Sequence, residues 1–183
     1  VYKRQDVRSV REKIALMEQK PYIISGDVKK NITMGANNID NNKLDESLKL
    51  SKSNFILESE KGTEEEVNQK GANFSGGQKQ RISIARAIYK DPEVFIIDDS
   101  FSALDYKTER ELRDDLLEKY SDRMIIMITQ RARVIYNFDM ILVMDEGKIV
   151  DRGTHDYLKQ NSNVYREILE SQDFYKGGKN GEK

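Results

Sequence analysis

Two short apolar segments constrain the fold of this chain more than any other feature. Residues 94–97 (VFII) and 123–129 (RMIIMIT) are apolar at successive positions and rich in β-branched side chains, which is typical of strands buried on both faces of a parallel sheet. The segment between them, 107–120 (KTERELRDDLLEKY), has the pattern of a charged helix. Its inner side is marked by Leu112, Leu116 and Leu117. A strand, a helix and a strand in this order predict an α/β fold.

The remaining segments add a helical part and a C-terminal part. An apolar strand is expected at residues 14–17, before a Pro-containing turn. From residue 36 the composition shifts to Asn, Lys, Glu and Ser, and we expect short amphipathic helices in a peripheral subdomain over about 36–90. The segment 140–153 resembles two strands joined at 145–147, and Thr154 begins a helix. The polar tail, 173–183, is expected to be disordered.

Charge and composition exclude several classes of protein. The 31 basic and 32 acidic residues give a formal net charge of −1, so no overall field would attract nucleic acid, and we expect no nucleic-acid partner. The chain has no cysteine, which excludes disulfides and thiolate metal sites. No apolar run approaches the roughly 18 residues that a membrane span needs.

One segment has the pattern of an anion site. In FSGGQKQR, residues 74–81, Ser75, Gly76 and Gly77 lead into a helix that begins near Gln78. Free backbone N–H groups and the positive end of a helix dipole attract anions there, and glycines let a phosphate approach closely. An ordinary Ser/Gly helix cap is the alternative. Asp98 favours the anion site, because it ends the buried strand, where α/β folds place ligand-binding groups.

Six motifs in order resemble the nucleotide-binding domain of an ATP-binding cassette (ABC) transporter of the exporter type. FSGGQ resembles the signature LSGGQ, VFIID the Walker B strand, and SALD the D-loop. MEQKPYIISGDVKKNI resembles the Q-loop segment, VNQKG the X-loop, and DEGKIVDRGTHDYL the C-terminal hairpin and helix. The similarity covers about residues 8–171. It implies a P-loop NTPase-like ABC ATPase domain, here its C-terminal portion, with an α-helical signature subdomain.

The resemblance implies a partner and a cofactor. In the family, two cassettes face each other head to tail, and each ATP lies between one chain's Walker A loop and the other chain's signature. Ser75, Gly76, Gly77 and Gln78 would therefore contact the γ-phosphate of ATP held by a second ABC cassette subunit. A transmembrane domain is the other partner that the family implies.

The same resemblance assigns three further residues. Asp98 would hold Mg²⁺ through water, Gln19 would sense the metal and the attacking water, and Asp105 would couple the two sites across the cassette interface. Each has a plainer alternative: a cap at the strand end for Asp98, a surface amide for Gln19 and a helix N-cap for Asp105.

At two catalytic positions the chain departs from the family pattern. Asp99 stands where the family usually has Glu, which positions or deprotonates the attacking water. Its side chain is one methylene shorter, and a displacement on the order of 1 Å can cost roughly 100-fold in rate. Gln130 stands where the family has the switch histidine, and an amide cannot become a cation. Together they indicate a degenerate site, as in the hydrolysis-impaired subunit of a heterodimeric exporter.

Three functions are therefore weighed. The first is the ATPase domain of an ABC exporter, at the cytoplasmic face of a membrane, with its substrate chosen by transmembrane helices outside this chain. The second is a regulatory subunit that binds ATP without useful hydrolysis. The third is a soluble ABC protein of DNA repair or translation. The X-loop-like VNQKG and the segment after Gln19 argue against the third, because in exporters they face the transmembrane domain.

The N-terminus carries two further expectations. The Walker A pattern G-x-x-x-x-G-K-[ST], which in the family lies upstream, does not occur in the 183 residues. Residues 1–5, VYKRQ, match the translation of a transposase adapter used in preparing sequencing libraries. We therefore expect residues 1–5 to be an artefact, residues 6–172 to be a partial nucleotide-binding domain, and the reading frame to be truncated.

Overall fold

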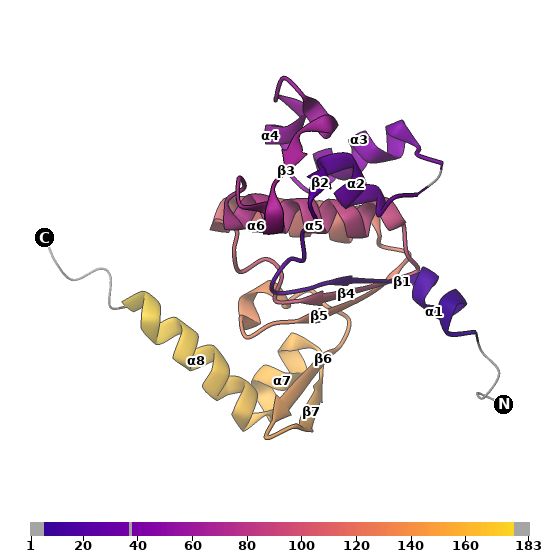
Figure 1. The fold of residues 1–183 in the computed structure, drawn as a ribbon. Coiled ribbons are helices and arrows are strands. Elements are labelled where there is room, and N and C mark those ends of the chain that lie inside the picture. Colours follow the sequence, from indigo (N-terminus) through magenta and orange to yellow (C-terminus); the bar gives the residue numbers. More distant parts are fainter. Residues whose placement is uncertain (1–5, 37, 178–183) are drawn as a thin grey trace, which may run out of the picture. The chain divides into compact units, whose positions relative to one another are not determined.

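The computed structural model describes residues 6–36 and 38–177 (Figure 1). Side chains are described as far as Gln172. Residues 1–5, which we expect to be an artefact, lie outside this range. The chain divides into two compact units, Val1–Ile128 and Thr129–Lys183.

The first unit is built on a parallel sheet of three strands in the order β1-β4-β5, with β1 at Ile14–Met17, β4 at Val94–Asp98 and β5 at Met124–Ile128. The short helix α1, Val7–Lys13, precedes β1, and α6, Tyr106–Lys119, joins β4 to β5. The predicted strand, helix and strand are confirmed, and their parallel pairing places the carboxyl ends of all three strands at one edge.

Helices cover one face of this sheet. Alternate side chains of β1 and β4 pack against α5, Gly76–Lys90, and against α6. The buried members of this cluster are Ala15, Met17, Ile84, Ala87, Ile88, Phe95, Ile97, Phe101, Leu112, Leu116 and Tyr120.

The other face of the sheet carries exposed apolar side chains. Leu16 of β1 is 54% exposed, and Met124, Ile126 and Ile128 of β5 are 60%, 44% and 52% exposed. The expectation that these strands are buried on both faces is therefore wrong for β5. Successive side chains of a strand point to opposite faces, and within the described residues α5 and α6 cover one of them.

A second core lies among short helices and a small hairpin. These elements are α2 (Val28–Thr33), α3 (Asn41–Leu50), α4 (Asn54–Leu57), the 3-10 helices η2 (Gly62–Glu64) and η3 (Gln69–Gly71), and the antiparallel strands β2 (Gly26–Asp27) and β3 (Glu66–Val67). The buried side chains of this core include Ile23, from the loop before β2, together with Val28, Ile32, Leu44, Leu48, Ile56 and Val67. The helical part therefore begins before residue 36, because α2, too short to show a clear periodicity, packs into the same core.

Helix α5 belongs to both cores. Ile82 and Ala85 pack into the helical cluster, whereas Ile84 and Ala87 pack against the sheet, as expected for a helix that is apolar on two sides.

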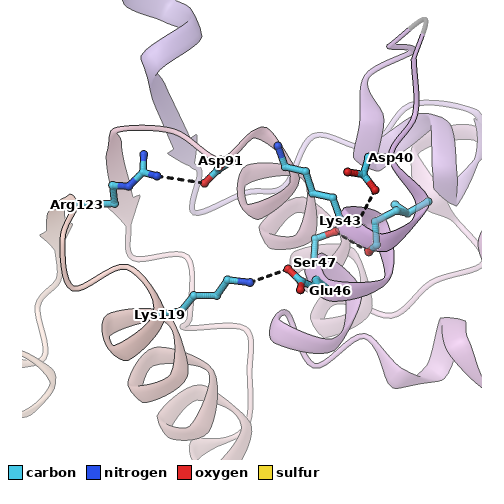
Figure 2. A network of polar contacts seen from close by, with 8 residues as sticks. Asp40, Lys43, Glu46, Ser47, Asp91, Lys119 and Arg123 are labelled. Atoms are coloured by element: carbon cyan, nitrogen blue, oxygen red, sulfur yellow. Dashed lines mark hydrogen bonds and ion pairs between the residues drawn. The ribbon is translucent and has the colours of Figure 1, made fainter.

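Ion pairs add to this packing (Figure 2). Lys119 of α6 reaches Glu46 of α3 at 3.0 Å, and Arg123 lies 3.7 Å from Asp91. Because these side chains are partly exposed, their contribution is small beside the burial of apolar surface.

The second unit contains the predicted hairpin. Strands β6, Ile141–Asp145, and β7, Lys148–Gly153, pair antiparallel around Glu146 and Gly147, both of positive φ. The 3-10 helix η4 (Ala132–Val134) precedes them, and α7 (His155–Asn161) and α8 (Asn163–Gly177) follow. Their common core contains Ala132, Ile141, Val143, Leu158 and Tyr165.

The C-terminal helix is longer than the sequence predicts. Residues 173–177, assigned above to a disordered tail, continue α8. No proline or glycine occurs between Asn163 and Lys176, so no residue of this segment breaks the helix. Residues 178–183 of the expected tail lie outside the described range.

Candidate functional site

Two adjacent carboxylates stand at the carboxyl end of β4. Asp98 is the last residue of the strand and its side chain is exposed. Asp99 has a φ of +43°, in the left-handed region, which Asp adopts more readily than most residues other than glycine. Its N–H donates to the carbonyl of Ile128 at 2.9 Å. The backbone of Asp99 is thus tied to the end of β5.

Gln19, from the segment after β1, lies beside Asp99. Its Nε2 donates to Asp99 Oδ2 over 3.4 Å, a long and therefore weak hydrogen bond between residues 80 positions apart. The structure thus brings together the Q-loop candidate and the candidate catalytic acid.

Two buried side chains hold the main chain that leads to Gln19. The hydroxyl of Ser100 donates to the carbonyl of Met17, and Nε2 of Gln80 donates to the carbonyl of Glu18 at 3.0 Å. Ser100 is 1% exposed and Gln80 is 0% exposed. Sequence reasoning missed both residues. The only available signal was position in the sequence: Ser100 follows Asp99, and Gln80 lies inside the FSGGQKQR segment.

The FSGGQ motif forms the start of α5. Ser75 is the N-cap: its Oγ accepts from Gln78 N–H at 3.3 Å, and Gln78 Oε1 accepts from Ser75 N–H at 2.8 Å. This reciprocal capping box fixes the first turn of a 15-residue helix. The cap that we considered as an alternative is therefore present, and it leaves the positive end of the helix dipole at an exposed surface.

The two glycines of the motif differ in their surroundings. A Cβ at Gly77 would lie 3.3 Å from the carbonyl oxygen of Ala103, so Gly77 allows α5 to pack against the SALD segment. A Cβ at Gly76 would meet nothing within 4 Å. Packing therefore explains Gly77 but not Gly76, and open space beside Gly76 is what a closely approaching phosphate requires.

Asp105 ends the SALD segment and caps α6. It accepts from the Thr108 N–H at 3.0 Å. Hydrogen bonds from the backbone and side chain of Thr108 hold the pKa of this carboxyl below its ordinary value. The helix N-cap weighed above is thus the role seen in the structure.

The donor set suits a metal that is held mostly by other ligands. Within the described residues, no three or more His, Cys, Asp or Glu side chains gather closely enough to bind a metal ion. Mg²⁺ commonly takes one or two carboxylates and completes its shell with water and phosphate oxygens. The exposed carboxylate of Asp98 fits such a site, which would depend on nucleotide.

Gln130 belongs to the second unit, so the structure does not group it with Asp99. Its side chain is exposed. Its carbonyl accepts from Nε2 of Gln172 at 2.6 Å, and Oε1 of Gln172 accepts from Ala132 N–H at 3.1 Å. One side chain of α8 thus holds the main chain on both sides of Arg131.

Comparison with known proteins identifies the family. The model of the ABC transporter family matches residues 1–102. P-glycoprotein 14 of Caenorhabditis elegans is 34% identical over 175 residues, which cover 92% of this chain and 13% of that protein. The ATP-dependent lipid A-core flippase of Saccharophagus degradans is 36% identical over 168 residues, 91% of this chain and 29% of that protein.

A solved structure shares the fold. A bacterial Atm1-family ABC exporter with ATP bound superposes with a TM-score of 0.86 at 30% identity, covering 91% of this chain and 30% of that one. This chain thus spans less than a third of each of these three proteins. None of the helices in its described part combines the length and the hydropathy that a membrane crossing needs.

These matches confirm the resemblance read from the motifs, and relatives named as exporters do not favour a soluble ABC protein. The chain belongs to the ABC transporter family, and its fold and motifs are those of the ATP-binding domain of an exporter.

Proposed function

We propose that this cassette pairs with a different cassette and that its own ATP site hydrolyses slowly, while its signature completes a competent site on the partner. The observation that carries the proposal is Asp99 at the position of the catalytic Glu, together with Gln130 at that of the switch histidine. The complete protein then couples ATP binding and hydrolysis, at the cytoplasmic face of a membrane, to export.

The short side chain of Asp99 has little freedom to compensate. Its backbone is held by the hydrogen bond to Ile128, and the left-handed φ fixes where the side chain starts. A carboxylate set back by on the order of 1 Å holds the attacking water poorly, at a cost of roughly 100-fold in rate. Gln130 can donate a hydrogen bond to a phosphate but adds no positive charge.

Asp98 and Gln19 are the residues of this chain that would hold Mg²⁺ and the water beside it. Bound Mg²⁺ neutralises charge that develops on the phosphates. The Asp98 carboxylate would accept hydrogen bonds from water on the metal, and Gln19 would orient the attacking water beside Asp99. Asp98 is the last residue of β4, and Gln19 Nε2 lies 3.4 Å from the carboxylate of the next residue, Asp99, which supports these roles.

The signature supports a role in trans. Ser75 and Gly76 are exposed at the start of α5, and the space beside Gly76 is open. Backbone N–H groups at a helix N-terminus stabilise charge on a phosphate without rearrangement. This surface would face the γ-phosphate of ATP bound by the partner cassette.

A transmembrane domain is the second proposed partner. Tyr22, after Gln19, is 64% exposed, and residues 68–70 of the VNQKG segment are exposed as well. An exposed tyrosine beside polar residues is a composition common at protein interfaces. The transported substrate would be selected by that domain.

The test compares two variants of the complete transporter. Asp99→Ala is expected to retain most of the steady-state ATPase rate, because turnover occurs mainly at the partner's site. Alanine at the partner's catalytic acid is expected to remove most of it. Loss of turnover in Asp99→Ala would refute the asymmetric assignment, and a wild-type complex that binds ATP without hydrolysing it would support a regulatory subunit instead.

A further inference from the structure

We infer that Gln80 is a positioning residue that sets the place of Gln19 and so connects the signature helix with this chain's own ATP site. The inference rests on the role proposed above for Gln19. It concerns a residue that neither contacts nucleotide in our proposal nor belongs to the FSGGQ motif.

The contact itself joins two distant segments. Gln80 lies on α5 and is fully buried, and its Nε2 donates to the carbonyl of Glu18 at 3.0 Å across 62 positions of sequence. Since the peptide unit is planar, the carbonyl of Glu18 and the Cα of Gln19 lie in one plane. A hydrogen bond that fixes this carbonyl therefore fixes where the Gln19 side chain begins.

A second hydrogen bond fixes the preceding peptide. Ser100, next to Asp99, donates to the carbonyl of Met17. The last residue of β1 and the residue after it are thus each held by a buried side chain. With both carbonyls held, Gln19 reaches Asp99 Oδ2 at 3.4 Å.

Apolar packing alone does not explain an amide at position 80. Oε1 of Gln80 is buried and has no hydrogen-bond partner among the described residues. An unpaired buried carbonyl oxygen is unfavourable, and an apolar side chain of similar volume would avoid it. The feature that such a side chain could not supply is the N–H donated to Glu18.

The position of Gln80 on α5 gives the contact a consequence. Gln80 stands two residues after Gln78, in the same continuous helix. A shift of α5 caused by ATP of the partner would move Gln80, and with it the carbonyl before Gln19. Because coupling between two binding sites is reciprocal, nucleotide at this chain's site would also alter the placement of the signature.

The test uses the complete heterodimer with alanine at the partner's catalytic acid, so that remaining hydrolysis reports on this chain's site. Gln80→Met and Gln80→Leu remove the N–H donor and replace the amide with an apolar side chain of similar size. Two variants are used so that the comparison can be made with whichever of them folds. Each is measured alone and with Gln19→Ala. Ile88→Val, which trims another buried residue of α5, is the matched control.

Two readouts are expected to change together. In steady-state ATPase assays Gln80→Met lowers kcat several-fold and leaves KM for ATP unchanged. In the double variant with Gln19→Ala it causes no further loss of kcat. In nucleotide-free protein, amide hydrogen exchange in the peptide 17–22 becomes roughly tenfold faster, whereas Ile88→Val changes neither quantity.

The outcomes distinguish failure of the positioning role of Gln80 from failure of the catalytic role proposed for Gln19. Unchanged exchange in residues 17–22, or a kcat loss that multiplies with that of Gln19→Ala, would overturn the positioning role of Gln80. If Gln19→Ala alone leaves kcat intact while exchange still rises in Gln80→Met, the positioning of Gln19 is supported and the catalytic role proposed for Gln19 is refuted.

Discussion

Asp99 combines a short carboxylate with a constrained backbone. Its φ of +43° is tolerated by Asp better than by β-branched or bulky residues, and its N–H donates to the carbonyl of Ile128. The side chain also lies within reach of Gln19. The backbone of Asp99 is therefore fixed in the fold, and the slow hydrolysis that we propose for this site would follow from the short reach of its side chain.

Restoring the longer acid should restore catalysis at this site. In a complex whose partner cassette lacks its catalytic acid, Asp99→Glu is expected to raise turnover by about 10- to 100-fold, because the carboxylate moves on the order of 1 Å toward the water. Asp99→Glu with Gln130→His should raise it further. Phosphate release is the measurement, and no increase in either variant would mean that the site is slow for another reason.

The two signature glycines should respond differently to the same substitution. Gly76→Ala adds a methyl group to open space, so it should leave the melting temperature of the complex nearly unchanged while lowering hydrolysis at the partner's site at least tenfold. Gly77→Ala places a methyl group against the carbonyl oxygen of Ala103. It should therefore lower both the melting temperature and hydrolysis at the partner's site. Thermal unfolding and ATPase assays check this, and normal hydrolysis in Gly76→Ala would contradict a phosphate contact there.

At the scale of single elements, the helix starts depend on side-chain caps. Ser75 begins α5, Asp105 begins α6 and Thr154 begins α7, each by accepting a backbone N–H of the first turn. The sequence predicts the helix start at Thr154 and offers the caps at Ser75 and Asp105 as alternatives to functional roles. They are predictable because a cap needs only residues three positions apart.

The cap at Asp105 makes the start of α6 sensitive to acid. Because the Thr108 hydrogen bonds lower the pKa of Asp105 below its ordinary value of 3.8, the cap contributes to helix stability above that pH. Its contribution is lost as pH falls through the lowered pKa. In a peptide of residues 103–122, helix content by circular dichroism should fall as the pH drops below the ordinary carboxyl value of 3.8.

Asp105→Asn supplies the control for this titration. Asn caps helices about as well as Asp and does not titrate in this range, so the acid-dependent difference between the two peptides reports on Asp105 alone. An equal loss of helix in both peptides would assign the effect to the other acids of α6.

At the scale of the whole molecule, the described residues leave apolar side chains of the sheet uncovered. One face of the three-stranded sheet carries Leu16, Met124, Ile126 and Ile128, each at least 44% exposed. Exposed apolar patches on this scale mark interaction surfaces or aggregation liabilities. A chain of these 183 residues alone is thus a poor candidate for independent stability.

The isolated chain is therefore expected to behave as an incomplete domain. Expressed alone, it should bind the dye ANS, unfold over a broad range of urea concentration and show no micromolar affinity for MgATP. Dye fluorescence, urea titration and calorimetry provide the measurements. Sharp cooperative unfolding together with micromolar MgATP binding would contradict this expectation.

The sequence by itself determined the local structure. The strands β4 and β5, the helices α5 and α6 and the hairpin β6–β7 lie where periodicity and turn residues place them. Such patterns repeat every two or 3.6 residues and can be read from neighbours alone. The ordered motifs also identified the family, because each preserves residue types at fixed spacing.

Only the tertiary structure decided which distant groups meet. It placed Gln19 beside Asp99, Gln80 beneath Glu18 and Gly77 against Ala103. The tertiary structure also left one face of β5 exposed, although the apolar sequence of this strand predicts burial on both faces. These features depend on how segments far apart in sequence pack together, and no local periodicity carries that information.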